Sequence, residues 1–255
     1  MFWILSFIWY PISFTECRHT LCHITFRSIT LCKFYINPWF CRVQDLGALS
    51  CRSYNEKFTN LEPMVDDRVV DIIKGVGLEG LLRTLGREIV HGLITALVER
   101  WRPETHTFHM PHGEVTITLQ DVEVLLGLRV DGKVVTGSTE KVWKEVCWDF
   151  LGFSVPDDNT KVLQGQRIVI KQLLEQVAVP LLPNAKEDQL HKFAWCYILV
   201  LLGDTIFTDK SGDKVHLMWV QLLEDLRNPR RYSWGSACLA WLYRELWKAS
   251  DKTVS

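Results

Sequence analysis

Residues 93–128 read LITALVERWRPETHTFHMPHGEVTITLQDVEVLLGL, and this stretch decides the fold expected for the chain. It begins within residues 87–101, where apolar side chains recur every three or four positions, as on one face of a helix. Pro103 prevents that helix from continuing. Two runs rich in β-branched and aromatic residues follow, separated by the turn sequence PHG. The stretch therefore predicts a helix, a β-hairpin near residues 105–119 and a second helix, capped by Thr118 and ended by Gly127.

The chain from about residue 62 onward carries further helical patterns. Residues 193–202 are apolar around the whole helical circumference, and about ten such residues are too few to cross a membrane, so we expect a central core helix. The fold class expected is mostly α, a multi-helix globular domain with one hairpin. The other helices are predicted over residues 62–75, 77–86, 138–151, 166–179, 215–226 and 233–250. Val142 is expected on the buried face of the third of these, and Ser233 is expected to cap the last.

Residues 1–53 differ from the rest of the chain and lack any lasting hydrophobic period. The opening MFWILSFIWYPISF, residues 1–14, is apolar, but it lacks a basic n-region and is too short for a membrane helix of roughly 20 residues. We expect an atypical, poorly folding or mis-assigned extension, with secretion or membrane association through residues 1–14 as the alternative. The extension contains five cysteines, and the spacings between them match no zinc pattern such as C-x2-C. They are Cys17, Cys22, Cys32, Cys41 and Cys51.

The overall composition describes a globular chain. Of the 255 residues 47% are hydrophobic, and 11 are tryptophans, enough for a sizeable core. The formal net charge of −1 provides no global field that would attract nucleic acid or an anionic membrane. The remaining cysteines, Cys147, Cys196 and Cys238, lie in apolar helical contexts and are expected to be buried reduced thiols.

Three histidines in the hairpin, His106, His109 and His112, raise the question of a metal site. On a strand His106 and His109 would face opposite sides, and His112 lies in the turn, so no metal site is expected. The sequence GVGLEG, residues 75–80, imitates a dinucleotide-binding motif, but it follows a helical segment instead of a strand. We therefore predict no cofactor.

The loop RNPRRYSWG, residues 227–235, places Arg227, Arg230 and Arg231 beside aromatic side chains. Arginines with aromatics can contact phosphates and bases, so a DNA- or chromatin-binding loop is the alternative function, beside a plain solvated connection. Candidate carboxylates are Glu114, Asp121 and Glu123. Asp121 is explained by helix-start electrostatics, and the others are expected to be ordinary surface charges.

The quoted block closely resembles the plant mobile domain, also called the aminotransferase-like plant mobile domain. Two later stretches, YILVLLGDTIFTDKSGDKVHLMWVQLLEDL and YSWGSACLAWLYRELWKAS, are similar to further blocks of that family in the same order, so that the resemblance covers residues 62–250. His112 departs from the pattern, which usually has an apolar or aromatic residue there. The matching signature residues are Trp101, Arg102, Pro103, Thr105, His106, Phe108, His109, Pro111, Gly113, Glu114, Thr118, Leu119, Asp121 and Gly127.

The resemblance implies a function as well as a fold. The domain is similar to segments of transposable elements and occurs in proteins of the maintenance-of-meristems type and in long-form serine/threonine phosphatase 7 homologues. It implies a non-enzymatic nuclear interaction domain, with protein partners and roles in meristem maintenance and silencing of mobile elements. The family continues beyond this chain's end, so we expect a C-terminally truncated domain that exposes apolar surface around Trp241, Leu242, Leu246 and Trp247.

Overall fold

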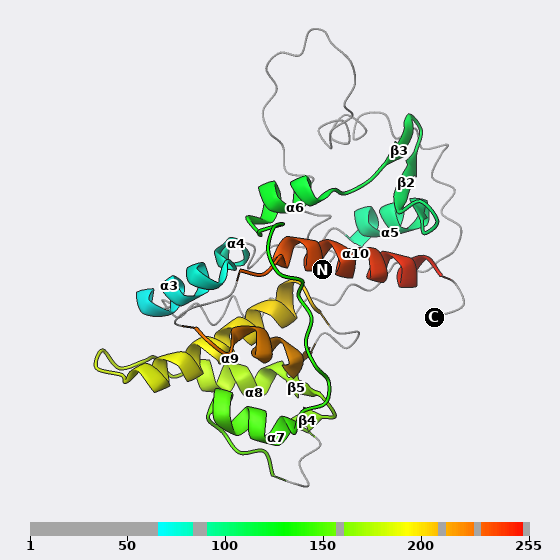
Figure 1. Ribbon diagram of the computed structural model, residues 1–255. Coiled ribbons are helices and arrows are strands. Elements are labelled where there is room, and N and C mark those ends of the chain that lie inside the picture. Colours follow the sequence, from blue (N-terminus) through cyan, green and yellow to red (C-terminus); the bar gives the residue numbers. More distant parts are fainter. Residues whose placement is uncertain (1–65, 84–90, 157–160, 209–212, 227–230, 252–255) are drawn as a thin grey trace.

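The computed structural model describes residues 66–83, 91–156, 161–208, 213–226 and 231–251 of the chain (Figure 1). Helices dominate, which confirms the mostly α fold class. They are α3 (Asp67–Val76), α4 (Glu79–Leu82), α5 (His91–Arg100), α6 (Leu119–Leu126), α7 (Trp143–Val146), π-helical η3 (Cys147–Leu151), α8 (Ile170–Val177), α9 (Glu187–Thr205), 3-10 helical η4 (Leu217–Leu223) and α10 (Trp234–Ser250). The predicted extension, residues 1–53, lies outside the described residues.

Helix α9 is the centre of the core, as its apolar sequence predicts. Every residue from 194 to 204 is buried, and α3, α8, η3 and η4 all pack against this helix. Trp195 satisfies its polar atom inside the core, because its Nε1 donates a hydrogen bond to the Leu223 carbonyl oxygen at 2.8 Å. Each fully buried large apolar side chain stabilises the folded state by roughly 1.5–3 kcal/mol. The many buried side chains of α9 therefore make this helix a major source of the stability of the core.

A small antiparallel sheet follows α5 and contains the predicted hairpin. Its strands are β1 (Trp101–Arg102), β2 (Thr107–Met110) and β3 (Gly113–Val115), in that order. The hairpin is confirmed, although its strands are shorter than residues 105–119. The sequence pattern places Trp101 in the preceding helix. This prediction is wrong, because the helix ends at Arg100 and Trp101 pairs with Phe108 in the sheet.

A second antiparallel sheet was not predicted. Its strands are β4 (Leu163–Gln164), β5 (Arg167–Val169) and β6 (Lys214–His216). The two helices predicted over residues 166–179 and 215–226 each begin with one of these strands, and the second continues only as 3-10 helix. Pairing of Ile168 with Val215 joins segments far apart in the sequence, so local periodicity could not reveal the sheet.

The helix predicted over residues 138–151 starts later and changes its winding. It begins at Trp143, and Val142, expected on its buried face, is 60% exposed. From Cys147 the chain winds as a π-helix until Gly152 ends it in the left-handed region, with a φ of 79°. The wider π turn places Cys147 and Leu151 in the core while Trp148 lies in solvent.

Helix α6 has the termini that the sequence predicts. The Thr118 hydroxyl accepts from the Asp121 backbone N–H, and the Asp121 carboxylate accepts from the Thr118 N–H, which together make a capping box. Gly127 ends the helix in the left-handed conformation. The end of α6 lies directly against α4, because a Cβ added to Gly80 would stand 1.6 Å from the Leu126 carbonyl oxygen.

Helix α10 packs against α5, α6 and β1. The expectation that Leu242 and Leu246 lie in an exposed apolar patch is wrong, because both side chains are fully buried by this packing. Trp247, expected in the same patch, is 48% exposed. Ser233 precedes the helix as predicted, but its hydroxyl does not cap it. The Ser233 hydroxyl instead donates to the Val130 carbonyl oxygen at 2.7 Å, which fixes the helix start to the segment after α6.

Candidate functional site

We call residues 101–118, which comprise β1, β2, β3 and the segments beside them, the hairpin block. Tyr243 of α10 connects this block to the helical core. Its hydroxyl donates to the Ile117 carbonyl oxygen at 2.6 Å and lies 2.9 Å from the Thr116 hydroxyl oxygen. Thr116 in turn donates to the His106 carbonyl oxygen at 2.6 Å. The chain before β2 and the chain after β3 are thereby joined at one point of α10.

Aromatic contacts reinforce the same junction. Trp101 packs edge-on against Phe108 at 4.9 Å between ring centroids and lies 5.3 Å from the Tyr243 ring. His106 stacks on Tyr243 at 5.1 Å with an interplanar angle of 17°. To do so His106 adopts a φ of 54°, a left-handed conformation that a residue other than glycine rarely takes. The ring contact and the bond to its carbonyl oxygen hold this conformation.

The three histidines lie in different places. His106 is held by Tyr243, His109 lies on β2 opposite Glu114, and His112 lies in the turn between β2 and β3. Among the described residues, no group of three or more His, Cys, Asp or Glu side chains is arranged to hold a metal ion. The expectation that His106 occupies a strand is wrong, because β2 begins at Thr107.

Two of the three candidate carboxylates have local partners. Asp121 closes the α6 capping box, and Glu114 accepts a hydrogen bond from the Thr107 hydroxyl at 3.1 Å. The Thr107 hydroxyl oxygen also lies 2.7 Å from that of Thr105. Glu123 is exposed on α6. Asp121 and Glu114 therefore stabilise the start of α6 and the pairing of β2 with β3.

The arginine-rich loop is described only at its end. Arg227 and Arg230 lie outside the described residues, whereas Arg231 is exposed and its carbonyl oxygen accepts from the Lys133 N–H at 2.8 Å. Asp131 is close by. Its hydrogen bonds from Arg129, with the Arg231 charge as a smaller cause, lower the pKa of this carboxyl below its usual value. A carboxylate thus offsets part of the positive charge beside the loop.

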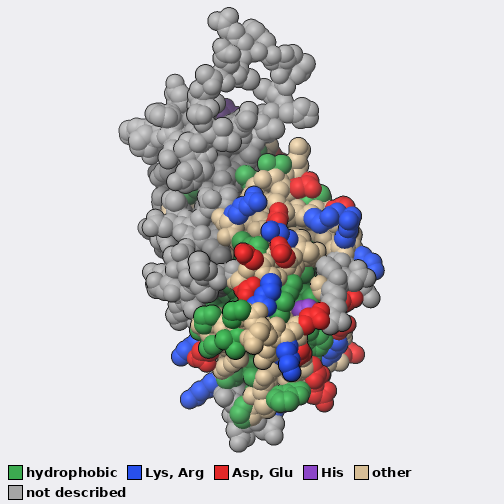
Figure 2. Space-filling view, turned by 90° about the vertical axis from the view of Figure 1, so that its left-hand side faces the viewer, with side chains coloured by type: hydrophobic (Ala, Val, Ile, Leu, Met, Phe, Trp, Pro, Cys, Tyr) green, Lys and Arg blue, Asp and Glu red, His purple; other side chains and the backbone are tan. Residues whose placement is uncertain are grey.

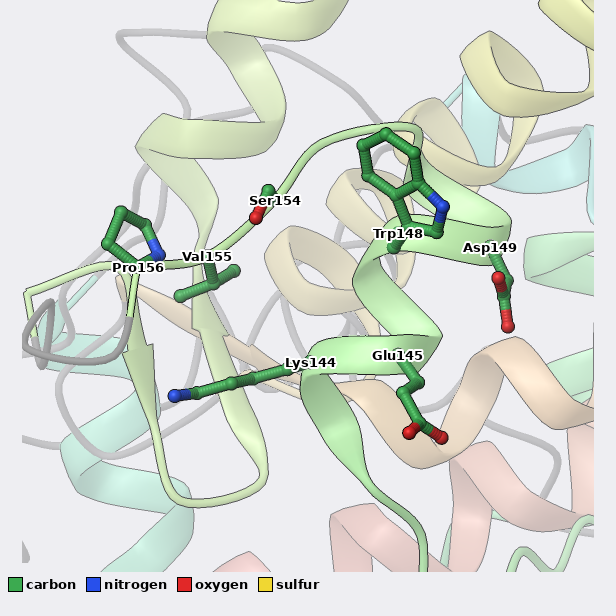
Figure 3. A pocket seen from close by; sticks show the side chains of 7 residues that line it. All are labelled: Lys144, Glu145, Trp148, Asp149, Ser154, Val155 and Pro156. Carbon is green, nitrogen blue, oxygen red and sulfur yellow. The ribbon is translucent and has the colours of Figure 1, made fainter.

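Two shallow grooves flank η3. The first has a volume of about 540 Å³ and contains an exposed aromatic side chain, Trp148, which is 62% accessible (Figure 3). It is lined by Lys144, Glu145, Trp148, Asp149, Ser154, Val155 and Pro156. The second, of about 310 Å³, lies between η3 and the ends of α8 and α9 and is lined in part by the exposed Val179 and Leu182.

One face of the molecule shows how charge and apolar surface are distributed. Acidic and basic side chains are interspersed there, and hydrophobic side chains gather in the lower part of the view (Figure 2). No large field of one sign covers this face, in keeping with the near-neutral chain. Within the described residues, no helix has both the length and the apolar character to cross a membrane.

The three described cysteines are buried, as predicted. Burial raises the pKa of Cys147, Cys196 and Cys238 to about 12, so all three are thiols and not reactive thiolates near neutral pH. The acid Asp204 is also buried, in the last turn of α9, and burial raises its pKa to about 6.

Comparison with known proteins identifies the domain. Residues 81–255 match the family model described as the plant mobile domain. The chain belongs to the plant mobile domain family. The hairpin signature that the sequence shares with this family is therefore the block that Tyr243 fastens to α10.

The plant mobile domain of this chain is similar to parts of longer proteins from Arabidopsis thaliana. A serine/threonine-protein phosphatase 7 long form homolog is 44% identical over 196 residues, which are 76% of this chain and 14% of that protein. Protein MAIN-LIKE 2 is 37% identical over 83% of this chain and 31% of its own length. Protein MAINTENANCE OF MERISTEMS is 37% identical over 83% and 43%, respectively. No solved structure matches the chain significantly.

Most signature residues of this plant mobile domain have architectural positions. Trp101 and Phe108 are buried, Gly113 takes a φ of 129° at the start of β3, and the rest are exposed or part of turns and caps. Sequence reasoning missed Tyr243 and Thr116, which connect the block to the core. The only signal was an aromatic residue within the apolar α10 pattern, and periodicity does not reveal what its hydroxyl binds.

Proposed function

We propose that this plant mobile domain is a non-enzymatic protein-interaction domain, of transposon-derived type, that acts in the nucleus. The observation that carries the proposal is the use of its signature residues. His106 stacks on Tyr243, Glu114 accepts a hydrogen bond from Thr107, and Asp121 caps α6. The residues shared with the family therefore stabilise the structure of the domain. The exposed grooves beside η3 provide surface on which a partner can bind.

The relatives support a role apart from any one catalytic activity. The same domain lies in a protein named as a phosphatase homolog, of which the aligned part is 14%, and in proteins named for meristem maintenance. A domain that occurs both in a phosphatase homolog and in proteins named for meristem maintenance is consistent with a common role in binding other proteins. We accordingly propose a role in meristem maintenance and in silencing of mobile elements.

Imaging and affinity capture test this proposal. The full chain with a C-terminal fluorescent protein should accumulate in nuclei of plant cells, and proteins captured with it should be nuclear. Accumulation in the secretory pathway or at a membrane would instead support the alternative that residues 1–14 direct the chain there. Phosphatase, aminotransferase or nuclease turnover by the purified chain, abolished by a point substitution in the hairpin, would show that the domain is an enzyme.

A DNA- or chromatin-binding function is the second candidate, motivated by the exposed Arg231 and the two arginines before it in sequence. Phosphate contacts predict an affinity for duplex DNA that falls steeply with salt. Replacing Arg227, Arg230 and Arg231 together by Ala should then weaken binding and reduce the salt dependence. Equal affinities of the variant and the parent chain over a salt series would eliminate this candidate.

A further inference from the structure

The first groove beside η3, which we name the Trp148 groove after its exposed tryptophan, has the features of a binding site. Trp148 is 62% exposed, whereas Trp101, Trp143, Trp195, Trp219 and Trp234 are buried. Tryptophan is strongly enriched at the residues that dominate binding energy in protein interfaces. It is presented by a π-helix, a winding that is rare and concentrated at functional sites.

The charges around Trp148 define what could bind there. Glu145 of α7 and Asp149 of η3 line the same groove, about one turn apart, and both are exposed. Among the described residues neither carboxylate has an ion-pair partner, unlike Asp188 and Glu245, which are paired with lysines on their own helices. Two acids beside an exposed indole make a surface that is complementary to a cation.

The position of the positive charge in the groove supports this complementarity. Lys144 extends toward Val155 and Pro156, whereas Glu145 and Asp149 point to the other side of the helix (Figure 3). The acidic side of the groove is therefore separate from its one lysine.

We propose that the Trp148 groove binds an extended segment of a partner protein that carries lysine or arginine side chains. One cationic group lies over the Trp148 indole, and Glu145 and Asp149 meet its charge. A cation over an indole face is attracted by the ring quadrupole, and a guanidinium or ammonium also donates hydrogen bonds to carboxylates. The inference rests on the proposed interaction function and names its site and partner chemistry.

The test uses the full chain and fluorescence anisotropy of defined labelled peptides. The probe is a 12-residue Gly/Ser peptide with four Lys and Arg residues, compared with the same peptide carrying Glu at those positions. We expect the basic peptide to bind and the acidic one not to bind. Trp148→Ala should weaken binding about 3- to 30-fold, the range for a cation–aromatic contact at a partly exposed site.

Further variants separate the aromatic contribution from a loss of folding. Trp148→Phe should keep much of the affinity, whereas Trp148→Leu should behave like Trp148→Ala, with unchanged circular dichroism and unfolding temperature for all three. Glu145→Gln with Asp149→Asn should also weaken binding and reduce its salt dependence. The matched control is Glu79→Gln with Glu123→Gln, which removes the same charge from exposed sites elsewhere and should leave the affinity unchanged.

Several results would overturn the inference. These are equal binding by Trp148→Ala and the parent chain, equal loss in the matched control, full affinity in Trp148→Leu, or preference for the acidic peptide. Binding of a single-stranded oligonucleotide in place of the basic peptide, lost in Trp148→Ala, would assign the indole to base stacking. Nuclear accumulation with unchanged partners in Trp148→Ala would leave the interaction function standing while refuting this site.

Discussion

Replacing Asp204 by Asn should make the free energy of unfolding less dependent on pH. Asp204 is 6% exposed in the last turn of α9, and burial raises its pKa from 3.8 to about 6. The negative end of the helix dipole also disfavours a carboxylate at this position. Because the folded-state pKa is raised, the stability contributed by the protonated acid is fully present below pH 3.8 and is lost as pH rises through about 6.

The magnitude follows from the size of the pKa change. Each unit corresponds to about 1.4 kcal/mol, so the whole change is about 3 kcal/mol. Roughly 2 kcal/mol of it falls between pH 4.5 and 7.5 by the same linkage. For a domain whose total stability is about 5–15 kcal/mol this is a large fraction.

Urea unfolding at both pH values measures the effect. The stability of Asp204→Asn minus that of the parent chain should rise by about 2 kcal/mol from pH 4.5 to 7.5, whatever constant offset the substitution brings. Asp71→Asn, at an exposed position on α3, is the control and should show no comparable pH-dependent difference. A stability difference between Asp204→Asn and parent that stays constant with pH would refute the reasoning.

Three other predictions concern two junctions of the fold and the histidines of the hairpin. Tyr243→Phe should destabilise the chain by about 1–3 kcal/mol in urea unfolding, because the Ile117 carbonyl oxygen loses its donor, and an unchanged unfolding midpoint would contradict this. Gly80→Ala should cost at least about 3 kcal/mol or prevent folding, since the new methyl overlaps the backbone of α6, whereas Gly92→Ala, with nothing within 4 Å, should be tolerated. Elemental analysis should find no stoichiometric zinc; one zinc per chain, lost on His109→Ala, would show that the histidines do converge.

The predicted features of the candidate site that hold are local ones. The hairpin, the Thr118 N-cap with Asp121 in the first turn and the Gly127 helix end are all predicted from residues within a few positions of one another. The grooves beside η3 were not foreseen, because they depend on where η3 lies relative to residues 154–156 and to α9. A pattern that predicts an amphipathic helix over residues 138–151 says nothing about a π-helical turn that exposes Trp148.

The sequence by itself determined the class of fold, the central helix and the hairpin block, since hydrophobic period, caps and turn residues act over one or two turns of chain. Tertiary structure alone decided three other features. Trp101 is a strand residue because it pairs with Phe108. Strand β5 is stabilised by hydrogen bonds to the backbone of β6, which lies far along the chain. Tyr243 became the anchor of the hairpin because α10 brings its hydroxyl within 2.6 Å of the Ile117 carbonyl oxygen. These features depend on hydrogen bonds between residues that are distant in sequence. Such residues come together only when the core has assembled, so local sequence patterns do not reveal them.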